Sequence, residues 1–222
     1  MVPAVSAADM QRIDAEAIEA LGIPRLLLME HAGLAVARAA QALAPYASTP
    51  IFVCCGGGFN GGDGLAAARH LHAWGYPLQI VVTGRLDHLR EEPAIYATIL
   101  KRLGLSLLEL TDTSRMPAVE HQLKACGLIL DGLLGIGSRG PVREPIRSLI
   151  ALLNRSGKPI VAIDLPSGLD ADTGAVQGMA VKATTTVTFG LPKLGCVKGE
   201  GPAHVGSLIV DTITIPHRLL AP

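Results

Sequence analysis

Carboxylates, a hydroxyl and an amide lie where the sequence predicts the ends of buried strands. Asp131 closes the apolar run Leu-Ile-Leu-Asp and Asp164 closes Val-Ala-Ile-Asp, so the two are expected at the same crevice, while Asp63 stands near the expected start of a helix. Carboxylates beside an anionic ligand repel it and one another unless a cation intervenes. Asp131, with the side-chain oxygens of Asn60 and Ser167, makes a set of hard ligands suited to an alkali or alkaline-earth ion. The aspartates could also move protons, although Asp63 could equally be only a favourable charge at a helix N-terminus.

Glycine-rich segments follow two of the expected strands. Residues 56–64 read Gly-Gly-Gly-Phe-Asn-Gly-Gly-Asp-Gly, and residues 131–141 read Asp-Gly-Leu-Leu-Gly-Ile-Gly-Ser-Arg-Gly-Pro. The first contains G-x-G-x-x-G beginning at Gly56, a pattern whose backbone N–H groups can approach a phosphate at a helix N-terminus. Arg139 in the second could face a phosphate. Two such segments favour one extended ligand, and the alternative for each is a tight turn required only by packing.

The first glycine segment lacks the partner that a dinucleotide dehydrogenase needs. Such an enzyme places an acidic residue about 20 positions further on, at the end of the next strand, where it holds the ribose. Here that strand ends Val-Val-Thr-Gly, and the first carboxylate after it is Asp87. We therefore predict a phosphate-binding loop without hydride transfer. The absence of a G-K-[ST] pattern argues likewise against a nucleotide-dependent kinase.

The elements that must position these residues alternate between helices and strands. Such alternation predicts an α/β protein, a three-layer αβα Rossmann-like fold with a mostly parallel central sheet, in one domain over 1–222. In such a sheet, ligands bind outside the carboxyl ends of the strands, where the strand order reverses. Helices are expected at 6–21, 24–43, 62–74, 91–103, 114–125 and 144–155, and strands at 50–55, 78–83, 105–110, 128–131, 160–164, 184–189 and 207–214.

Other candidate side chains leave their alternatives open. Lys193 is either a phosphate contact or a solvated lysine in a turn. His31 could approach the crevice from the second helix, or be an ordinary hydrogen-bonded helix residue. His70 and His72 lie two positions apart on a helix and cannot share a face, which argues against a metal pair.

The composition excludes several classes of protein. Nineteen basic residues balance nineteen acidic ones and aromatic residues make up 3% of the chain, a poor footprint for nucleic-acid binding. The first residues have neither a basic nor an apolar region of a signal peptide, and no apolar stretch reaches the ~18 residues of a membrane helix. The four cysteines lack zinc-site spacing and are expected to be reduced core residues. We predict a cytoplasmic protein whose partner is a small molecule or a second copy of itself, with no nucleic acid and no membrane.

Taken together, the motifs resemble the YjeF N-terminal domain family, whose characterised activity is NAD(P)HX epimerisation. The resemblance covers nearly the whole chain in order. The matching stretches are 28–30 (LME), 60–65 (NGGDGL), 67–71 (AARHL), 131–135 (DGLLG), 164–168 (DLPSG), 189–195 (FGLPKLG) and 215–216 (IP).

The resemblance implies a site for hydrated NADH or NADPH together with a potassium ion. It assigns substrate binding to Phe59, Asn60, Gly61, Gly62, Asp63, Gly135, Ile136, Gly137, Ser138, Arg139, Gly140, Pro141 and Asp164, and the potassium ligands to Asn60, Asp131 and Ser167. The family usually has two asparagines before the glycine pair, and Phe59 replaces the first of them. The resemblance further implies an isomerase of nicotinamide nucleotide repair, a homodimer, and functional pairing with a separate NAD(P)H-hydrate dehydratase.

The implied chemistry agrees with the residues. The substrate carries a hydroxyl on C6 of the reduced nicotinamide ring, and inversion is easiest through loss of that hydroxyl to an iminium and return of water. Asp164 is the predicted catalytic group that protonates the leaving hydroxyl and stabilises the cation. The rival interpretation is a non-catalytic member of the same fold. Loss of the acidic residues would favour it, and here they are present.

Overall fold

A single parallel sheet organises the chain. The computed structural model describes residues 3–44, 46 and 48–221, so Met1, Val2, Pro45, Ala47 and Pro222, which the one-domain prediction includes, lie outside the described residues. Within the described part, seven strands pair in the order β3-β2-β1-β4-β5-β6-β7, each parallel to its neighbours. They are β1 (Ile51–Cys55), β2 (Leu78–Thr83), β3 (Leu107–Leu110), β4 (Leu128–Gly132), β5 (Ile160–Ile163), β6 (Thr185–Phe189) and β7 (Ser207–Asp211).

Burial of both faces explains the composition of the central strands. Every residue of β1, β4 and β5 is buried, which suits the continuous apolar runs typical of a parallel sheet covered on both sides. The chain moves outward from β1 to β3 and then returns to place β4 against the other side of β1. The strand order therefore reverses between β1 and β4, and a crevice opens there at the carboxyl ends of the strands.

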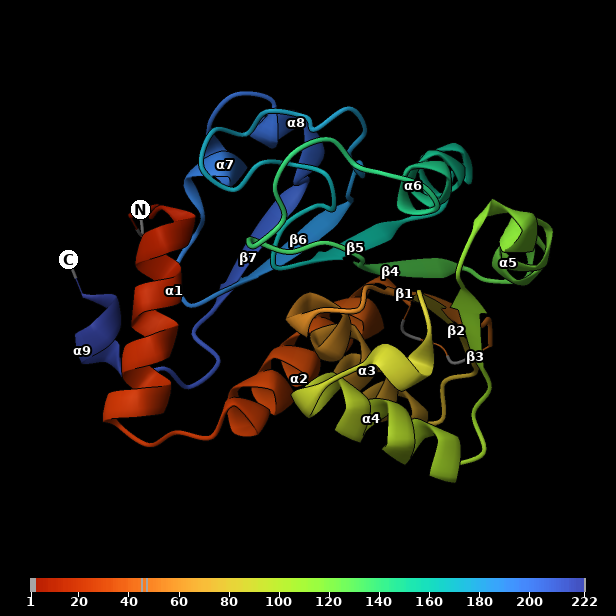
Figure 1. Cartoon of the computed structure of the whole chain (residues 1–222), viewed down its shortest axis with the longest axis horizontal. Coiled ribbons are helices and arrows are strands. Elements are labelled where there is room, and N and C mark those ends of the chain that lie inside the picture. The colour runs from red at the N-terminus through yellow and green to blue at the C-terminus, as the bar shows by residue number, and fades with distance from the viewer. Residues whose placement is uncertain (1–2, 45, 47, 222) are drawn as a thin grey trace.

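Helices cover both faces of this sheet (Figure 1). The helices α2, α3 and α4 pack on one face and α5 and α6 on the other, while α1 and α9 lie beside the β7 edge. The bounds are α1 (Ala7–Ala15), η1 (Glu16–Ala20), α2 (Arg25–Leu43), α3 (Phe59–Ala73), η2 (Leu86–His88), α4 (Glu91–Arg102), η3 (Thr113–Arg115), α5 (Met116–Lys124), α6 (Ile146–Arg155), α7 (Leu194–Val197), α8 (Gly201–His204) and α9 (His217–Leu220).

The predicted fold class is confirmed, with local differences. The helix expected to begin at residue 62 begins at Phe59, because Gly58 is its N-cap and the glycines form its first turns. The first helix does not stay regular to its end, since Glu16–Ala20 form a π-helical segment. The short helices α7, α8 and α9 were not predicted, because four-residue helices lack an apolar repeat. Among the described residues, none of the helices has the length and apolar content needed to cross a bilayer.

Candidate functional site

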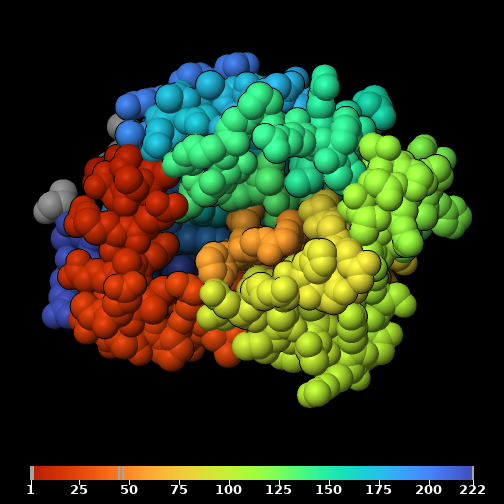
Figure 2. Space-filling model, viewed as in Figure 1, coloured from red at the N-terminus to blue at the C-terminus, as the bar shows by residue number. Residues whose placement is uncertain are grey.

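A cavity of about 640 Å³ opens at the carboxyl ends of β1, β4 and β5. In Figure 2 the hollow lies between the N-terminal helices, drawn in red, and the segment after β4, drawn in green, with the start of α3 in orange beside it. One face of α1, the start of α3, the segment after β4 and the residue after β5 supply its lining. The cavity thus occupies the point where the strand order reverses, which is the predicted position of the ligand site.

The first glycine segment forms one side of the cavity because its backbone approaches the neighbouring segment very closely. A Cβ atom on Gly56 would lie 2.0 Å from Leu133 O, so only glycine fits there. Among the predicted contacts, Phe59, Asn60, Gly61 and Asp63 line the cavity, as do the two residues before them, whereas Gly62 is buried under Met29. The N-terminus of α3 accordingly faces the cavity, a favourable place for an anion.

Only part of the second glycine segment that was predicted to bind the substrate lines the cavity. Gly135, Ile136, Gly137 and Ser138 belong to the lining, and Arg139, Gly140 and Pro141 lie outside it. The Arg139 guanidinium donates hydrogen bonds to Ile136 O (2.7 Å) and Ser138 O (2.9 Å). The arginine therefore braces its own loop in this structure.

Asp164 lines the cavity and is paired with a buried lysine. The residue has a φ of +64°, which an aspartate tolerates better than most side chains and which is typical of strained functional positions. Its Oδ1 accepts hydrogen bonds from the Lys193 ammonium, Thr188 Oγ1 (3.2 Å) and Phe189 N (3.1 Å). All three donors use the same oxygen, so among the described residues Oδ2 has no protein donor and is available to a ligand in the cavity.

Lys193 is not the solvated lysine in a turn that the sequence left open. Its side chain is 1% exposed, and the ammonium also donates to Phe189 O (2.8 Å) and Thr188 Oγ1 (3.2 Å). It is a counterion for Asp164 within the cavity wall. The sequence signal was weak because the two residues are far apart along the chain and meet only through the pairing of β5 with β6.

Two more carboxyls, Asp63 and Asp14, line the same cavity. Burial raises the pKa of Asp63 well above its usual value, and the negative charges of Asp164 and Asp14 raise it further while Lys193 opposes them. Burial likewise raises the pKa of Asp14 to about 6, against the opposing charge of Lys193. Clustered carboxyls with raised pKa values are typical of sites that transfer protons.

Sequence reasoning missed Asp14, although a signal was present. The apolar face of the first helix includes Met10 and Ile18, and Asp14 lies four residues from each, so it falls in the middle of that face. A lone charge on a buried helix face calls for a structural or chemical explanation. Here the explanation is that all three side chains border the cavity.

The predicted cation ligands Asn60, Asp131 and Ser167 meet around the backbone of Leu134. Asn60 Nδ2 donates to Leu134 O (2.9 Å), and Leu134 N donates to Ser167 Oγ (2.9 Å). Ser167 in turn donates to Asp131 through Oγ (2.6 Å) and through its backbone N (2.9 Å). The three side chains therefore belong to one polar cluster below the two glycine segments.

Asp131 does not share the cavity wall with Asp164, which corrects the expectation that both lie in one crevice. It lies within β4 rather than after it, and its side chain is fully buried. Burial raises the pKa of Asp131 to about 6 in spite of its hydrogen bonds. No cationic side chain pairs with Asp131 among the described residues. A single buried carboxylate with neutral amide, hydroxyl and carbonyl oxygens beside it fits a monovalent cation.

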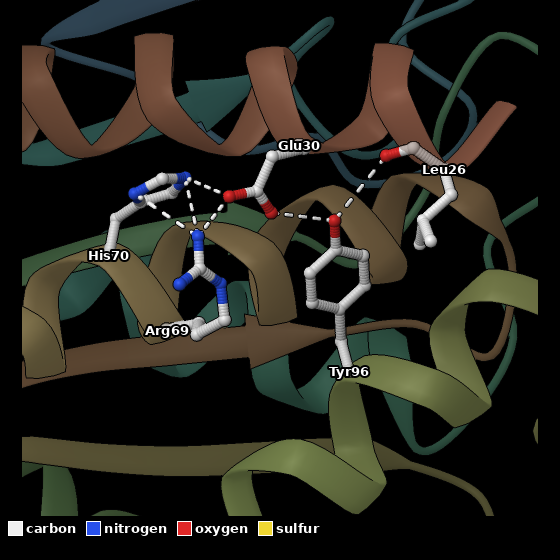
Figure 3. A network of polar contacts seen from close by, with 5 residues as sticks. All are labelled: Leu26, Glu30, Arg69, His70 and Tyr96. Atoms are coloured by element: carbon white, nitrogen blue, oxygen red, sulfur yellow. Dashed lines mark hydrogen bonds and ion pairs between the residues drawn. The ribbon is translucent and has the colours of Figure 1, made fainter. Parts of the chain in front are cut away.

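A second polar network lies between α2 and the helices α3 and α4, outside the cavity lining (Figure 3). Glu30 on α2 accepts hydrogen bonds from Arg69 and from Tyr96 Oη (2.8 Å), and lies 3.0 Å from His70 Nε2. Burial lowers the pKa of His70, and it raises that of Tyr96. The network joins α2, α3 and α4, so His70 helps to hold helices together. His31 lies outside the cavity lining.

Phe59, the residue that departs from the family pattern, lies at the rim of the cavity. Its side chain is 47% exposed, and the Arg25 guanidinium lies 4.6 Å from the centre of its ring. Arg25 also pairs with Glu91 (3.0 Å). The aromatic ring is therefore held in place from one side by a cation–π contact.

Comparisons with known proteins agree with this geometry. A protein of Limosilactobacillus fermentum named NAD(P)H-hydrate epimerase is 41% identical over 93% of this chain and 95% of its own length. A protein of Salinibacter ruber named bifunctional NAD(P)H-hydrate repair enzyme Nnr is 40% identical over 98% of this chain, which spans only 42% of that relative's length. The crystal structure of yeast ynu0 superposes with a TM-score of 0.84 at 27% identity, covering 98% of this chain and 91% of that one. Residues 25–195 match the family described as YjeF-related protein N-terminus, and the chain belongs to that family.

Proposed function

We propose that this chain is an NAD(P)H-hydrate epimerase, which interconverts the R and S forms of hydrated NADH and NADPH at C6. The observation that carries the proposal is the end-to-end similarity to the Limosilactobacillus fermentum protein of that name. The site supports it, since a cavity beside two glycine segments contains several carboxyls. These are the groups that a proton-transfer reaction on a bound dinucleotide requires.

The cavity suits an iminium pathway. The N-terminus of α3 would hold a phosphate of the dinucleotide, and residues 135–138 would contact the other part of the same ligand. Loss of the C6 hydroxyl leaves positive charge on the nicotinamide ring. The free oxygen of Asp164, fixed by the three donors on its partner oxygen, would stabilise that charge without having to reorganise.

A potassium ion bound by Asn60, Asp131 and Ser167 is part of the proposal. The support is the chemistry of the cluster: one fully buried carboxylate, an amide and a hydroxyl that all contact the Leu134 backbone or each other. A bound cation would compensate the negative charge of Asp131 and hold the two glycine segments in fixed positions relative to each other.

Assembly and location complete the proposal. We expect a cytoplasmic homodimer that acts together with a separate NAD(P)H-hydrate dehydratase. The relatives named bifunctional are more than twice as long as the part that matches this chain, which leaves room in them for a second catalytic domain.

The proposal is tested by supplying purified protein with one C6 epimer of hydrated NADPH, without nucleotide triphosphate, and following its conversion by chiral chromatography. We expect equilibration of the epimers well above the spontaneous rate. A rate equal to that of heat-inactivated protein would reject the proposed activity. Hydrated NADH in a parallel reaction reports the preference between the two dinucleotides.

A further inference from the structure

Inversion of C6 requires proton transfer on both faces of the nicotinamide ring, a requirement that rests on the proposed function. On one face the C–O bond breaks, its electron pair leaves with oxygen, and an acid supplies the proton that makes the leaving group water. On the other face a water molecule bonds to C6 of the iminium and gives its proton to a carboxylate. The two steps together lose and regain one water molecule, so they need no oxidant, reductant or co-reactant. One carboxyl can serve only one of the two faces.

Asp164 and Asp63 reach the cavity from the carboxyl end of the sheet. Asp164 directly follows β5, and Asp63 lies in the second turn of α3, which follows β1. Only β4 separates these two strands. Both carboxyls therefore come from the strand-end side of the cavity, its floor.

Asp14 reaches the cavity from a different element, the helix α1, which packs on the segment after β6: Met10 of this helix contacts Gly190, and Val5 before it pairs with Lys193. Its carboxyl receives no hydrogen bond from any described residue. It is partly buried, with the apolar side chains of Met10 and Ile18 on the same helix face. A carboxyl that lies on an apolar helix face and receives no hydrogen bond has no structural use that its contacts reveal.

The helix changes its winding next to Asp14. Glu16–Ala20 form a π-helical segment in which Leu21 N donates to Glu16 O (3.1 Å), and Ile18 and Glu19 from this stretch also line the cavity. The π-helical segment ends this helix, just before the turn at Gly22. The changed winding lies where the helix borders the cavity.

We infer that Asp14 is a second catalytic acid–base residue, serving the face of the nicotinamide ring opposite to the one that faces Asp63 and Asp164. Its pKa of about 6 lets the carboxyl donate and accept a proton near neutral pH. Burial raises this pKa most, Asp164 raises it further, and the charges of Lys193 and Arg25 lower it.

The test compares two readouts on each epimer in H2(18)O: inversion at C6, followed by chiral chromatography, and incorporation of ¹⁸O into the C6 hydroxyl, followed by mass spectrometry. We expect Asp14→Asn and Asp14→Ser to lose inversion by ~10²–10⁴-fold. The epimer whose hydroxyl faces the floor should still exchange oxygen with retention, because the floor carboxyls expel and return water on that face. Glu16→Gln is the matched control, since it removes an exposed carboxylate of the same helix outside the cavity and should match the parent.

The outcomes separate the inference from the proposed function. A parent protein that accelerates neither inversion nor exchange refutes the proposed function, and the inference falls with it. An active parent together with folded Asp14 variants that invert at the parent rate overturns the inference alone. Equal loss of inversion and exchange for both epimers, in variants at least as stable as the parent, also overturns it, because Asp14 would then not be specific to one face.

Discussion

The ion pair between Asp164 and Lys193 contributes both to the proposed catalysis and to the stability of the fold. The two side chains are 12% and 1% exposed, so neither charge is solvated well enough to stand alone. Removing one partner of a buried pair costs about 3–5 kcal/mol, because the other charge stays buried and unpaired. A substitution designed to test catalysis at Asp164 will therefore also destabilise the fold, because it leaves the charge of Lys193 unpaired.

We predict that Asp164→Asn lowers kcat by ~10²–10⁴-fold, as expected for loss of an acid–base group. It should also lower the free energy of unfolding by about 3–5 kcal/mol, measured by urea denaturation, because the Lys193 ammonium loses its counterion.

The double variant Asp164→Asn/Lys193→Met is the control for this prediction. It removes both charges and should recover much of the stability while its turnover stays low. Parent-like turnover in a folded Asp164→Asn protein would move the catalytic role to another carboxyl.

Asp14 should make stability depend on pH. Its pKa is about 6 in the folded protein and near 3.8 when unfolded, so the unfolded chain binds fewer protons between these values. The free energy of unfolding therefore falls as pH rises from about 4 to about 6 and does not recover above that range. Asp14→Asn should match the parent near pH 4 and exceed its stability by on the order of 1 kcal/mol at pH 7.

Thermal melts across this pH range measure the difference. Asp164, Lys193 and Arg25 act on Asp14 in both the parent and Glu16→Gln, so this control should follow the parent curve. A variant that is less stable than the parent at pH 7 would contradict the prediction.

At the scale of elements, the position of α3 decides whether its N-terminus faces the cavity. Two features of α2 set that position: the Glu30 network and the close crossing at Gly33 (Figure 3). A Cβ atom on Gly33 would lie 2.5 Å from Ala66 Cβ and 2.7 Å from Ala67 N. The helices can therefore approach this closely only because residue 33 has no side chain.

We predict that Gly33→Ala destabilises the protein, although glycine to alanine within a helix ordinarily stabilises it by roughly 0.5–1 kcal/mol. The added methyl group has no room, and overpacking typically costs about 1–3 kcal/mol. Turnover should fall as well, since α3 must shift.

Ala42→Gly, at an exposed position of the same helix, calibrates the helix propensity and should cost only roughly 0.5–1 kcal/mol. A higher melting temperature for Gly33→Ala than for the parent would show that the crossing is less tight than its geometry indicates.

At the scale of the whole molecule, the cation cluster joins segments from three strand ends. Asn60 follows β1, Asp131 is the penultimate residue of β4 and Ser167 follows β5. A ligand that binds only the folded state stabilises it in proportion to the logarithm of its concentration, by about 2.7 kcal/mol at one hundred times its dissociation constant. Binding of a cation at this cluster would therefore stabilise all three segments around the cavity rather than one loop.

We predict that potassium chloride raises the melting temperature relative to tetramethylammonium chloride at equal ionic strength, and that Asp131→Asn abolishes the difference. Equal melting curves of the parent in the two salts would argue against the site. In crystals grown with potassium, metal–oxygen distances of roughly 2.1 Å, which are typical of magnesium, would show that the bound ion is not potassium.

The sequence by itself determined the architecture and the general place of the site. Apolar runs of strand length alternating with helical periods predict a parallel sheet, because these patterns are local. Glycine segments and aspartates at strand ends also identify the crevice, since parallel strands bring their carboxyl ends to one edge. The carboxyl Asp164 and most of the first glycine segment line the cavity as the sequence indicated.

Only the tertiary structure decided what surrounds each of these groups. Lys193 could not be assigned from its neighbours, because its partner Asp164 comes from a different strand. Asp131 was placed in the crevice by its position at a strand end, yet it is wholly buried within β4. Asp14 enters the cavity because α1 packs beside it. Burial and charge pairing depend on which elements pack together, and those long-range contacts set the proton affinities on which the chemistry depends.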